Sequence, residues 1–251
     1  MDESPEPIDR PHTRIPLWVM IVAVLGGFLA SNVIALVILA AHHNATSSLN
    51  SSTAIGVEEI GLWIFFIGAA GYASHRYLSG RLREDYGLHV RLWPDLPLGL
   101  LIGALCQLVI VPLLYLPFEL SNPSISKSLS QPAKFLIGSG RNGGELIVAA
   151  VVVVGAPIVE ELFFRGLVLQ SILGRFRDIS TRVARATAIV VSAVVFALVH
   201  FEPLQFLGLV VVGLILGYAK MRTRRLGLAI FIHAGFNLVA FVALVSTATI
   251  R

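Results

Sequence analysis

Six polar residues stand inside apolar runs in the last hundred residues of the chain. They are Glu160, Glu161, Arg165, His200, His233 and Asn237. An ionisable group in a hydrocarbon environment costs roughly 2.5 to 3.5 kcal/mol on insertion scales, so each one needs a reason. A desolvated carboxylate can act as a general base toward water, and imidazole and amide groups can orient that water or stabilise an oxyanion. The set is typical of water-mediated peptide hydrolysis.

The spacing of the two adjacent carboxylates assigns them different tasks. Glu161 and Arg165 are four residues apart with the acid first, which is the favourable order for an ion pair on one helix face. Glu160 projects about 100° away around that helix and does not share the arginine equally. We therefore predict that Glu160 is the catalytic base and that Glu161 and Arg165 form a structural pair that supports it.

The histidines and the asparagine complete the predicted site. His233 and Asn237 are four residues apart and form one polar helix face, from which we expect them to donate hydrogen bonds to an oxyanion. We expect His200 to hold the same water as Glu160, and Phe196 to pack one turn before it. At about 1.5 Å of rise per residue, Glu160 and His200 both lie roughly 22 Å from an arginine-rich loop, so they share a layer.

The elements that must position these residues are membrane helices. Of the 251 residues, 56% are hydrophobic and 14% charged, whereas a soluble domain carries about a quarter charged residues. The apolar runs are continuous rather than alternating, which argues against a β-barrel and predicts an all-α, polytopic transmembrane bundle. We expect about seven membrane helices, over residues 15–41, 54–77, 96–116, 146–173, 183–201, 204–219 and 226–245.

The rest of the chain fits the same organisation. Residues 1–14 are expected to form a disordered cytoplasmic tail, and residues 15–251 one transmembrane domain whose motif-bearing core is about 146–240. Two Gly-x-x-x-Gly patterns, Gly99 with Gly103 and Gly213 with Gly217, predict close helix packing. The single cysteine, Cys106, excludes an intramolecular disulfide.

Charged residues outside the predicted site indicate orientation. Fourteen of the 19 Lys and Arg residues adjoin loops on one side and four adjoin the other, which places the N-terminus in the cytoplasm and the C-terminus outside. We expect the membrane to be the plasma, or inner, membrane and do not expect nucleic acid as a partner. Glu58 and Glu59 are expected to be interfacial, and Glu84, Asp85 and Asp95 to form a solvated charge mixture.

Three motifs resemble those of the CAAX protease and bacteriocin-processing family, known as CPBP or Abi. They are Glu-Glu-Leu-Phe-Phe-Arg at 160–165, Phe-Ala-Leu-Val-His at 196–200 and His-Ala-Gly-Phe-Asn at 233–237. The resemblance implies an intramembrane endopeptidase like the type II CAAX prenyl endopeptidases. In it, Glu160 and His200 would activate water, and His233 and Asn237 would supply the oxyanion site. The implied partners are the lipid bilayer and a membrane-associated peptide or protein substrate, prenylated or not.

Two alternatives stay open. Zinc could be held by Glu160, His200 and His233, but it would leave as base only Glu161, which Arg165 engages, and the His-Glu-x-x-His signature is absent. We therefore predict a reaction without a metal or another cofactor. The second alternative is a non-catalytic transporter or sensor that uses the same groups as a proton relay. The oligomeric state is left open.

Overall fold

The structure is a computed structural model that describes residues 14–42, 51–129, 149–176 and 180–249, and the regular elements among them are all helical. The predicted all-α class is confirmed. In chain order the first half contains α1 (Leu17–His42), α2 (Ser51–Tyr77), α3 (Leu82–Tyr86), α4 (Leu92–Leu105), η1 (Cys106–Ile110), α5 (Val111–Ser121) and α6 (Ser124–Leu129). The second half contains η2 (Ala150–Gly155), α9 (Ala156–Glu161), η3 (Leu162–Val168), α10 (Leu169–Arg175), α11 (Thr181–Val199), α12 (Phe206–Thr223) and α13 (Gly227–Thr249).

Several of these helices are built to cross a membrane. Within the described residues, four stretches are long and apolar enough: Leu17–Ile38, Leu92–Ser121, Thr181–Val199 and Phe206–Thr223. A shorter apolar helix covers Gly227–Ala243. The chain is therefore an integral membrane protein, and the number of about seven crossings stays a prediction. The predicted tail, apart from Arg14, and the first residues of the predicted run 146–173 lie outside the described residues.

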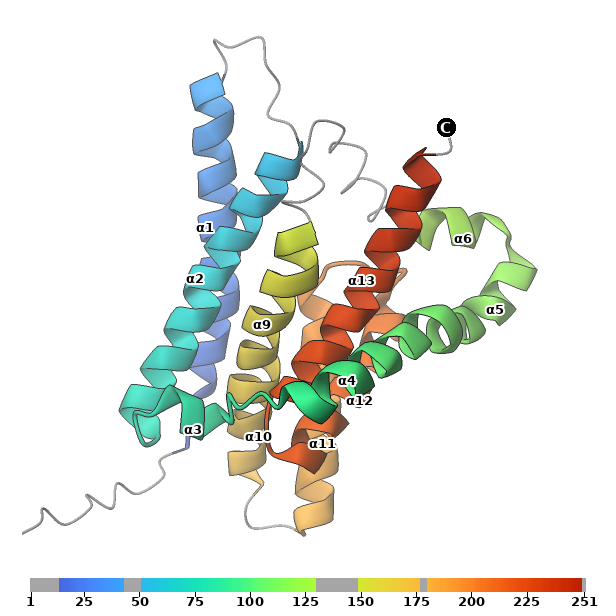
Figure 1. Ribbon diagram of the computed structural model, residues 1–251. Helices are drawn as coiled ribbons and strands as arrows, with labels where there is room; N and C mark the ends of the chain where they lie inside the picture. Colours follow the sequence, from blue (N-terminus) through green and yellow to red (C-terminus); the bar gives the residue numbers. More distant parts are fainter. Residues whose placement is uncertain (1–13, 43–50, 130–148, 177–179, 250–251) are drawn as a thin grey trace, which may run out of the picture.

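The helices surround one central rod formed by η2, α9, η3 and α10. Figure 1 shows α1 and α2 side by side, with the rod between this pair and α13, and α4 lying across α13. Helices α11 and α12 follow as a hairpin and pack against each other, as the short connection between residues 201 and 204 predicts. The rod contacts α2, α11, α12 and α13, so its residues can meet side chains from both ends of the sequence.

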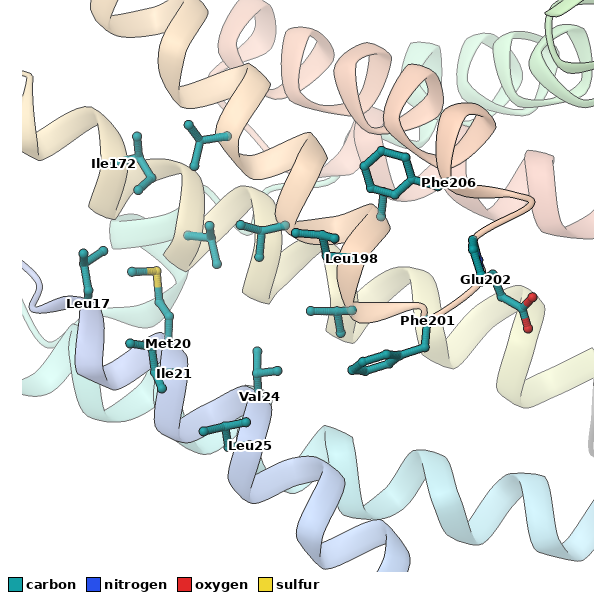
Figure 2. A pocket seen from close by; sticks show the side chains of 16 residues that line it. Leu17, Met20, Ile21, Val24, Leu25, Ile172, Leu198, Phe201, Glu202 and Phe206 are labelled. Carbon is teal, nitrogen blue, oxygen red and sulfur yellow. The ribbon is translucent and has the colours of Figure 1, made fainter. Parts of the chain in front are cut away.

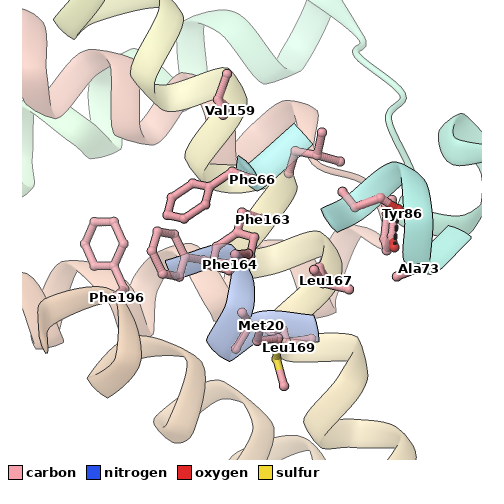
Figure 3. Close-up of a cluster of buried hydrophobic side chains, with 14 of the residues drawn as sticks. Met20, Phe66, Ala73, Tyr86, Val159, Phe163, Phe164, Leu167, Leu169 and Phe196 are labelled. Carbon is pink, nitrogen blue, oxygen red and sulfur yellow. Dashed lines mark hydrogen bonds between the residues drawn. The ribbon is translucent and has the colours of Figure 1, made fainter. Parts of the chain in front are cut away.

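Aromatic side chains fill the space between the rod and its neighbours. Phe66 of α2 stacks on Phe163 with 3.9 Å between ring centroids, and Phe164 meets the rings of Phe66 and Phe196 edge-on. Figure 3 shows this cluster of buried rings between α2, the rod and α11. Stacked and edge-to-face pairs contribute about 0.5–1.5 kcal/mol each beyond the area that they bury, and their shape fixes the helix positions.

Glycines allow the closest helix contacts. A Cβ atom on Gly103 would overlap with the backbone oxygen of Ile232 in α13, and one on Gly213 would lie only 2.9 Å from Ala193 in α11. No side chain fits at either glycine without moving the neighbouring helix. Both Gly-x-x-x-Gly patterns therefore mark helix packing within the chain, as predicted.

Prolines explain two wide turns in the helices. The π-helical segments η1 and η2 each end just before a helix whose second residue is a proline, Pro112 or Pro157. Proline has no backbone N–H, so it leaves a carbonyl of the preceding turn without its helical donor and pushes the backbone aside. The wide turn η2 leads directly into α9, which carries Glu160 and Glu161.

The connection between α2 and α4 is held by residues from the other end of the chain. Asp95 is 1% exposed and accepts two hydrogen bonds from Arg225, at 2.5 and 2.9 Å. The buried ammonium group of Lys220 donates to the carbonyl of Tyr86, whose hydroxyl donates to the carbonyl of Ala70 at 3.0 Å. The expected solvated charge mixture is therefore wrong for Asp95, because the fold buries it against a cation 130 residues away.

Candidate active site

Glu161 lies at the centre of a buried charged network. Its Oε1 atom accepts hydrogen bonds from Arg165 at 2.8 Å and from Nδ1 of His233 at 3.0 Å. The side chains of Glu161 and Arg165 are fully buried, and the guanidinium also donates to the carbonyl of Gly213 in α12 at 3.3 Å. The predicted ion pair is confirmed. His233 joins it from α13, so the pair ties the rod to two other helices.

The network determines which ring nitrogen of His233 remains available. The ionised carboxylate of Glu161 can only accept, so Nδ1 of His233 carries a proton and donates it. Nε2 is then left for another partner, and it donates a hydrogen bond only when the ring carries both protons. An oxyanion role for His233 requires that doubly protonated form, and this role stays a prediction.

Phe196 connects the network to the second histidine. Its ring, which is buried, lies 4.5 Å from the ring of His200 and 5.7 Å from that of His233 between centroids. The guanidinium carbon of Arg165 lies 4.4 Å from the centre of the same ring. Phe196 therefore packs as expected from the sequence, and its ring contacts both histidines with a surface that has no hydrogen-bonding atom.

Glu160 and His200 face each other across a short gap. Nε2 of His200 lies 3.9 Å from Oε2 of Glu160, an atom that is buried and has no hydrogen-bond partner among the described residues. Nδ1 of His200 lies 2.7 Å from the carbonyl oxygen of Phe196, which can only accept, so this nitrogen is the donor and Nε2 presents its lone pair to the gap. The depth estimate from the sequence correctly placed both residues in one layer.

The gap has the size for one shared water molecule. A distance of 3.9 Å is too long for a direct hydrogen bond. A water with hydrogen bonds of about 2.8 Å to both atoms would have an angle of about 90° between them. The side chain of Glu160 is 14% exposed and that of His200 is 30% exposed. Both are therefore largely removed from solvent but can be reached from a cavity.

Asn237 is anchored by an irregularity of the rod. Its Nδ2 atom donates to the carbonyl of Val152 in η2 at 2.8 Å. In the wide turn the next donor for that carbonyl would be residue 157, which is a proline and has no N–H. The amide group thus satisfies a backbone oxygen that would otherwise be costly in a membrane. The second Nδ2 hydrogen remains for the predicted oxyanion role of Asn237.

A cavity of about 430 Å³ opens beside Glu160 and His200. Six of its ten lining residues come from the α1–α2 pair, which the sequence motifs did not indicate. The lining residues are Phe28, Ser31, Asn32, Glu59, Leu62, Phe66, Glu160, Phe164, Val199 and His200. Glu59, which was expected to be interfacial, therefore lines the same cavity as the predicted base. A carboxylate in the first third of an otherwise apolar helix was the signal that could have indicated this.

A larger apolar groove adjoins the polar cavity. Its volume is about 1060 Å³, and Figure 2 shows hydrophobic side chains of α1, α10 and α11 and of the turn before α12 around it. Val199 lines both spaces. Phe28 of the cavity and Phe201 of the groove touch edge-to-face at 4.9 Å between ring centroids, so one aromatic contact separates the two.

The described histidines and carboxylates do not converge as metal ligands. In residues 14–42, 51–129, 149–176 and 180–249, no group of three or more His, Cys, Asp or Glu side chains is arranged to hold a metal ion. Of the zinc set considered from the sequence, His233 is engaged by Glu161, which is itself bound to Arg165. Independence from metal stays a prediction.

Comparison with known proteins supports the predicted relationship. Residues 142–239 match the family model described as Rce1-like, type II CAAX prenyl endopeptidase Rce1-like. No curated protein and no solved structure matched the chain. The matched region contains Glu160, Glu161, Arg165, His200, His233 and Asn237. The family resemblance predicted from the three motifs is thereby confirmed for the segment that carries all six site residues.

Proposed function

We propose that the protein is an intramembrane endopeptidase of the glutamic type, which hydrolyses a peptide bond with water activated by Glu160 and His200. The family match supports a CAAX-type intramembrane endopeptidase in general. The observation that carries the finer proposal is the 3.9 Å gap between Oε2 of Glu160 and Nε2 of His200, two residues that line the same cavity.

The proposed reaction begins at this gap. The carboxylate of Glu160 takes a proton from the bound water while Nε2 of His200 accepts the other O–H hydrogen bond and orients the oxygen. The oxygen attacks the carbonyl carbon, and the C–N bond breaks when Glu160 returns the proton to the leaving amine. The products are a carboxylic acid and an amine, and the glutamate regains its charge.

His233 and Asn237 are proposed to stabilise the oxyanion that forms in between. Nε2 of doubly protonated His233 and the second Nδ2 hydrogen of Asn237 would be the donors. Glu161 binds Nδ1 of His233, Phe196 contacts the rings of both histidines, and the carbonyl of Val152 accepts the other Nδ2 hydrogen of Asn237. Positioned donors of this kind contribute about 2.7–4 kcal/mol each to the transition state.

The proposed substrate is a peptide or protein that carries an apolar part in the bilayer. The apolar groove next to the cavity supports this, because a hydrocarbon or a hydrophobic peptide segment fits its lining. A prenylated C-terminus is one form of such a substrate and an unmodified hydrophobic segment is another. We also propose the orientation given by the basic loops, with the N-terminus in the cytoplasm and the C-terminus outside the plasma membrane.

The test is Glu160→Gln, which keeps the size of the side chain and removes the base. Purified protein in lipid nanodiscs would be incubated with hydrophobic peptides, with and without a prenyl group, and the products read by mass spectrometry. General-base catalysis contributes about 10²–10⁴-fold, so we expect the rate to fall at least a hundredfold. Glu84→Gln, at an exposed carboxylate, is the control and should retain full activity. Equal rates for the wild type and Glu160→Gln would refute the proposed mechanism.

A further inference from the structure

The apolar groove and the polar cavity follow each other along one face of α1. In that helix the groove is lined by Leu17, Ile21 and Val24, and the cavity by Phe28 and Asn32. These positions are three or four residues apart, so they lie on one helix face. Val199, near the end of α11 and one residue before His200, lines both spaces from the other side. A chain that lies in the groove therefore points toward the reacting groups.

Two aromatic rings lie at the boundary between the groove and the cavity. Phe28 lines the cavity and Phe201 lines the groove, and their rings meet edge-to-face with 4.9 Å between centroids. Figure 2 shows the ring of Phe201 extending from the end of α11 toward α1. A polypeptide with its apolar part in the groove and its scissile bond at Glu160 therefore has to pass this pair of rings.

The packing of α1 against α2 holds Phe28 in place. The residue before it, Gly27, is buried, and a Cβ atom there would lie 3.2 Å from Cα of Leu62 in α2. Such a close contact between two helices leaves little freedom to either backbone. It fixes the part of α1 from which the ring of Phe28 projects.

Phe201 has an unusual backbone conformation. Its φ angle is 51°, in the left-handed region that a bulky residue rarely adopts, and its N–H donates to the carbonyl of Leu198 at 3.2 Å. The turn that follows is fastened by Tyr115 of α5, whose hydroxyl donates to the carbonyl of Leu204 at 2.8 Å and accepts from the N–H of Gly208 at 3.0 Å. Strained residues persist where the surrounding contacts impose them, and they are concentrated at functional sites. Here the imposed conformation keeps the ring in contact with its partner on α1.

We propose that Phe28 and Phe201 are specificity-determining residues, whose rings form a constriction that admits a small substrate residue between an apolar anchor in the groove and the scissile bond. This inference rests on the proposed peptidase function. Phe201 is 71% exposed, so its ring has room to turn aside for a backbone with a small side chain. A bulky side chain would collide with the fixed ring of Phe28. The substrate class is a membrane peptide with glycine, alanine or serine beside the cleaved bond, on the side of its apolar anchor.

Cleavage sites in a peptide mixture test the constriction before the natural substrate is identified. Peptides of a membrane fraction cut after lysine, which retain internal aromatic residues, would be incubated with the protein in nanodiscs, and the new termini would be sequenced by mass spectrometry. At one position beside the cleaved bond the wild type should select glycine, alanine or serine over leucine, phenylalanine and tryptophan. In Phe201→Ala this selectivity should fall at least tenfold, since one methylene in an apolar pocket already changes specificity by about 10–200-fold.

Three further variants keep the test decisive. Phe28→Ala removes the other ring from the opposite helix and should relax selectivity at the same position, even if Phe201→Ala does not fold. Phe201→Tyr keeps the ring and should retain the wild-type selectivity. Tyr218→Ala removes an exposed ring of α12 outside both spaces and should also retain it. Equal selectivity in the wild type, Phe201→Ala and Phe28→Ala, or a wild type that accepts bulky residues at every position, would overturn the constriction alone. No cleavage by the wild type would overturn the proposed function and this inference together.

Discussion

The buried ion pair between Glu161 and Arg165 makes a sharp prediction about stability. In Arg165→Met the carboxylate of Glu161 keeps only His233 as a partner, in a place with no exposure to solvent. Removing one member of a buried pair costs about 3–5 kcal/mol, and the hydrogen bond from Arg165 to the carbonyl of Gly213, which is also lost, adds about 1 kcal/mol. We therefore expect the free energy of unfolding to fall by about 4–6 kcal/mol.

The second variant separates the ion pair from simple packing. Glu161→Gln with Arg165→Met removes both charges, so no lone charge stays buried, and the pair of substitutions should cost less than the sum of the single ones. The coupling energy should be at least about 2 kcal/mol, in the range measured for residues of one network. Activity should stay low in the double variant, because His233 has lost its charged partner.

The assay is reversible unfolding in mixed micelles as the fraction of denaturing detergent rises, followed by tryptophan fluorescence. The matched control is Arg81→Met, which breaks an ion pair with Glu84 whose side chains are 73% and 57% exposed. Exposed pairs contribute about 0.2–1 kcal/mol, so this variant should lose no more than that. An equal loss for Arg165→Met and Arg81→Met, or additive losses in the double variant, would refute the account of the network.

Three more predictions concern other parts of the site and the fold. Phe196→Leu keeps a buried apolar side chain but loses the ring against both histidines, so kcat should fall at least tenfold with little change in KM, measured on a cleaved peptide. Gly103→Ala should destabilise the protein by about 1–3 kcal/mol in the same unfolding assay, whereas Gly68→Ala, whose Cβ would meet no atom within 4 Å, should be neutral or stabilising. Dialysis against a zinc chelator should leave the rate unchanged, and activity restored only by added zinc would favour a metalloendopeptidase.

The spacing of residues along single helices predicted the positions of the charged site residues well. The four-residue separation of Glu161 and Arg165 was enough to predict their ion pair, because residues one turn apart on a helix are neighbours whatever surrounds them. The common depth of Glu160 and His200 followed from the rise of a helix and the position of the arginines. Both arguments use only geometry within a helix and the plane of the membrane.

The missed features depend on contacts between distant segments. Nothing in the spacing of Glu59 shows that α2 packs against the rod, and nothing near Asp95 indicates that Arg225 will cover it. The bond from Asn237 to Val152 depends on a wide turn before Pro157, which changes the partners of the backbone carbonyls. Each of these three contacts depends on how whole helices pack against one another. The order of residues along a single helix does not contain that information.

The fastening of the α2–α4 connection by Lys220 and Arg225 has a consequence for biogenesis. Asp95 leaves the ribosome 130 residues before its arginine, an interval of roughly 7 to 26 s at the usual speed of translation. During that interval Lys220, which will later donate to the carbonyl of Tyr86, has not yet been synthesised. The loop around Tyr86 is therefore fixed in place only after α12 has been inserted. A nascent chain arrested before residue 220 should therefore expose this loop to proteases, and release of the full chain should protect it.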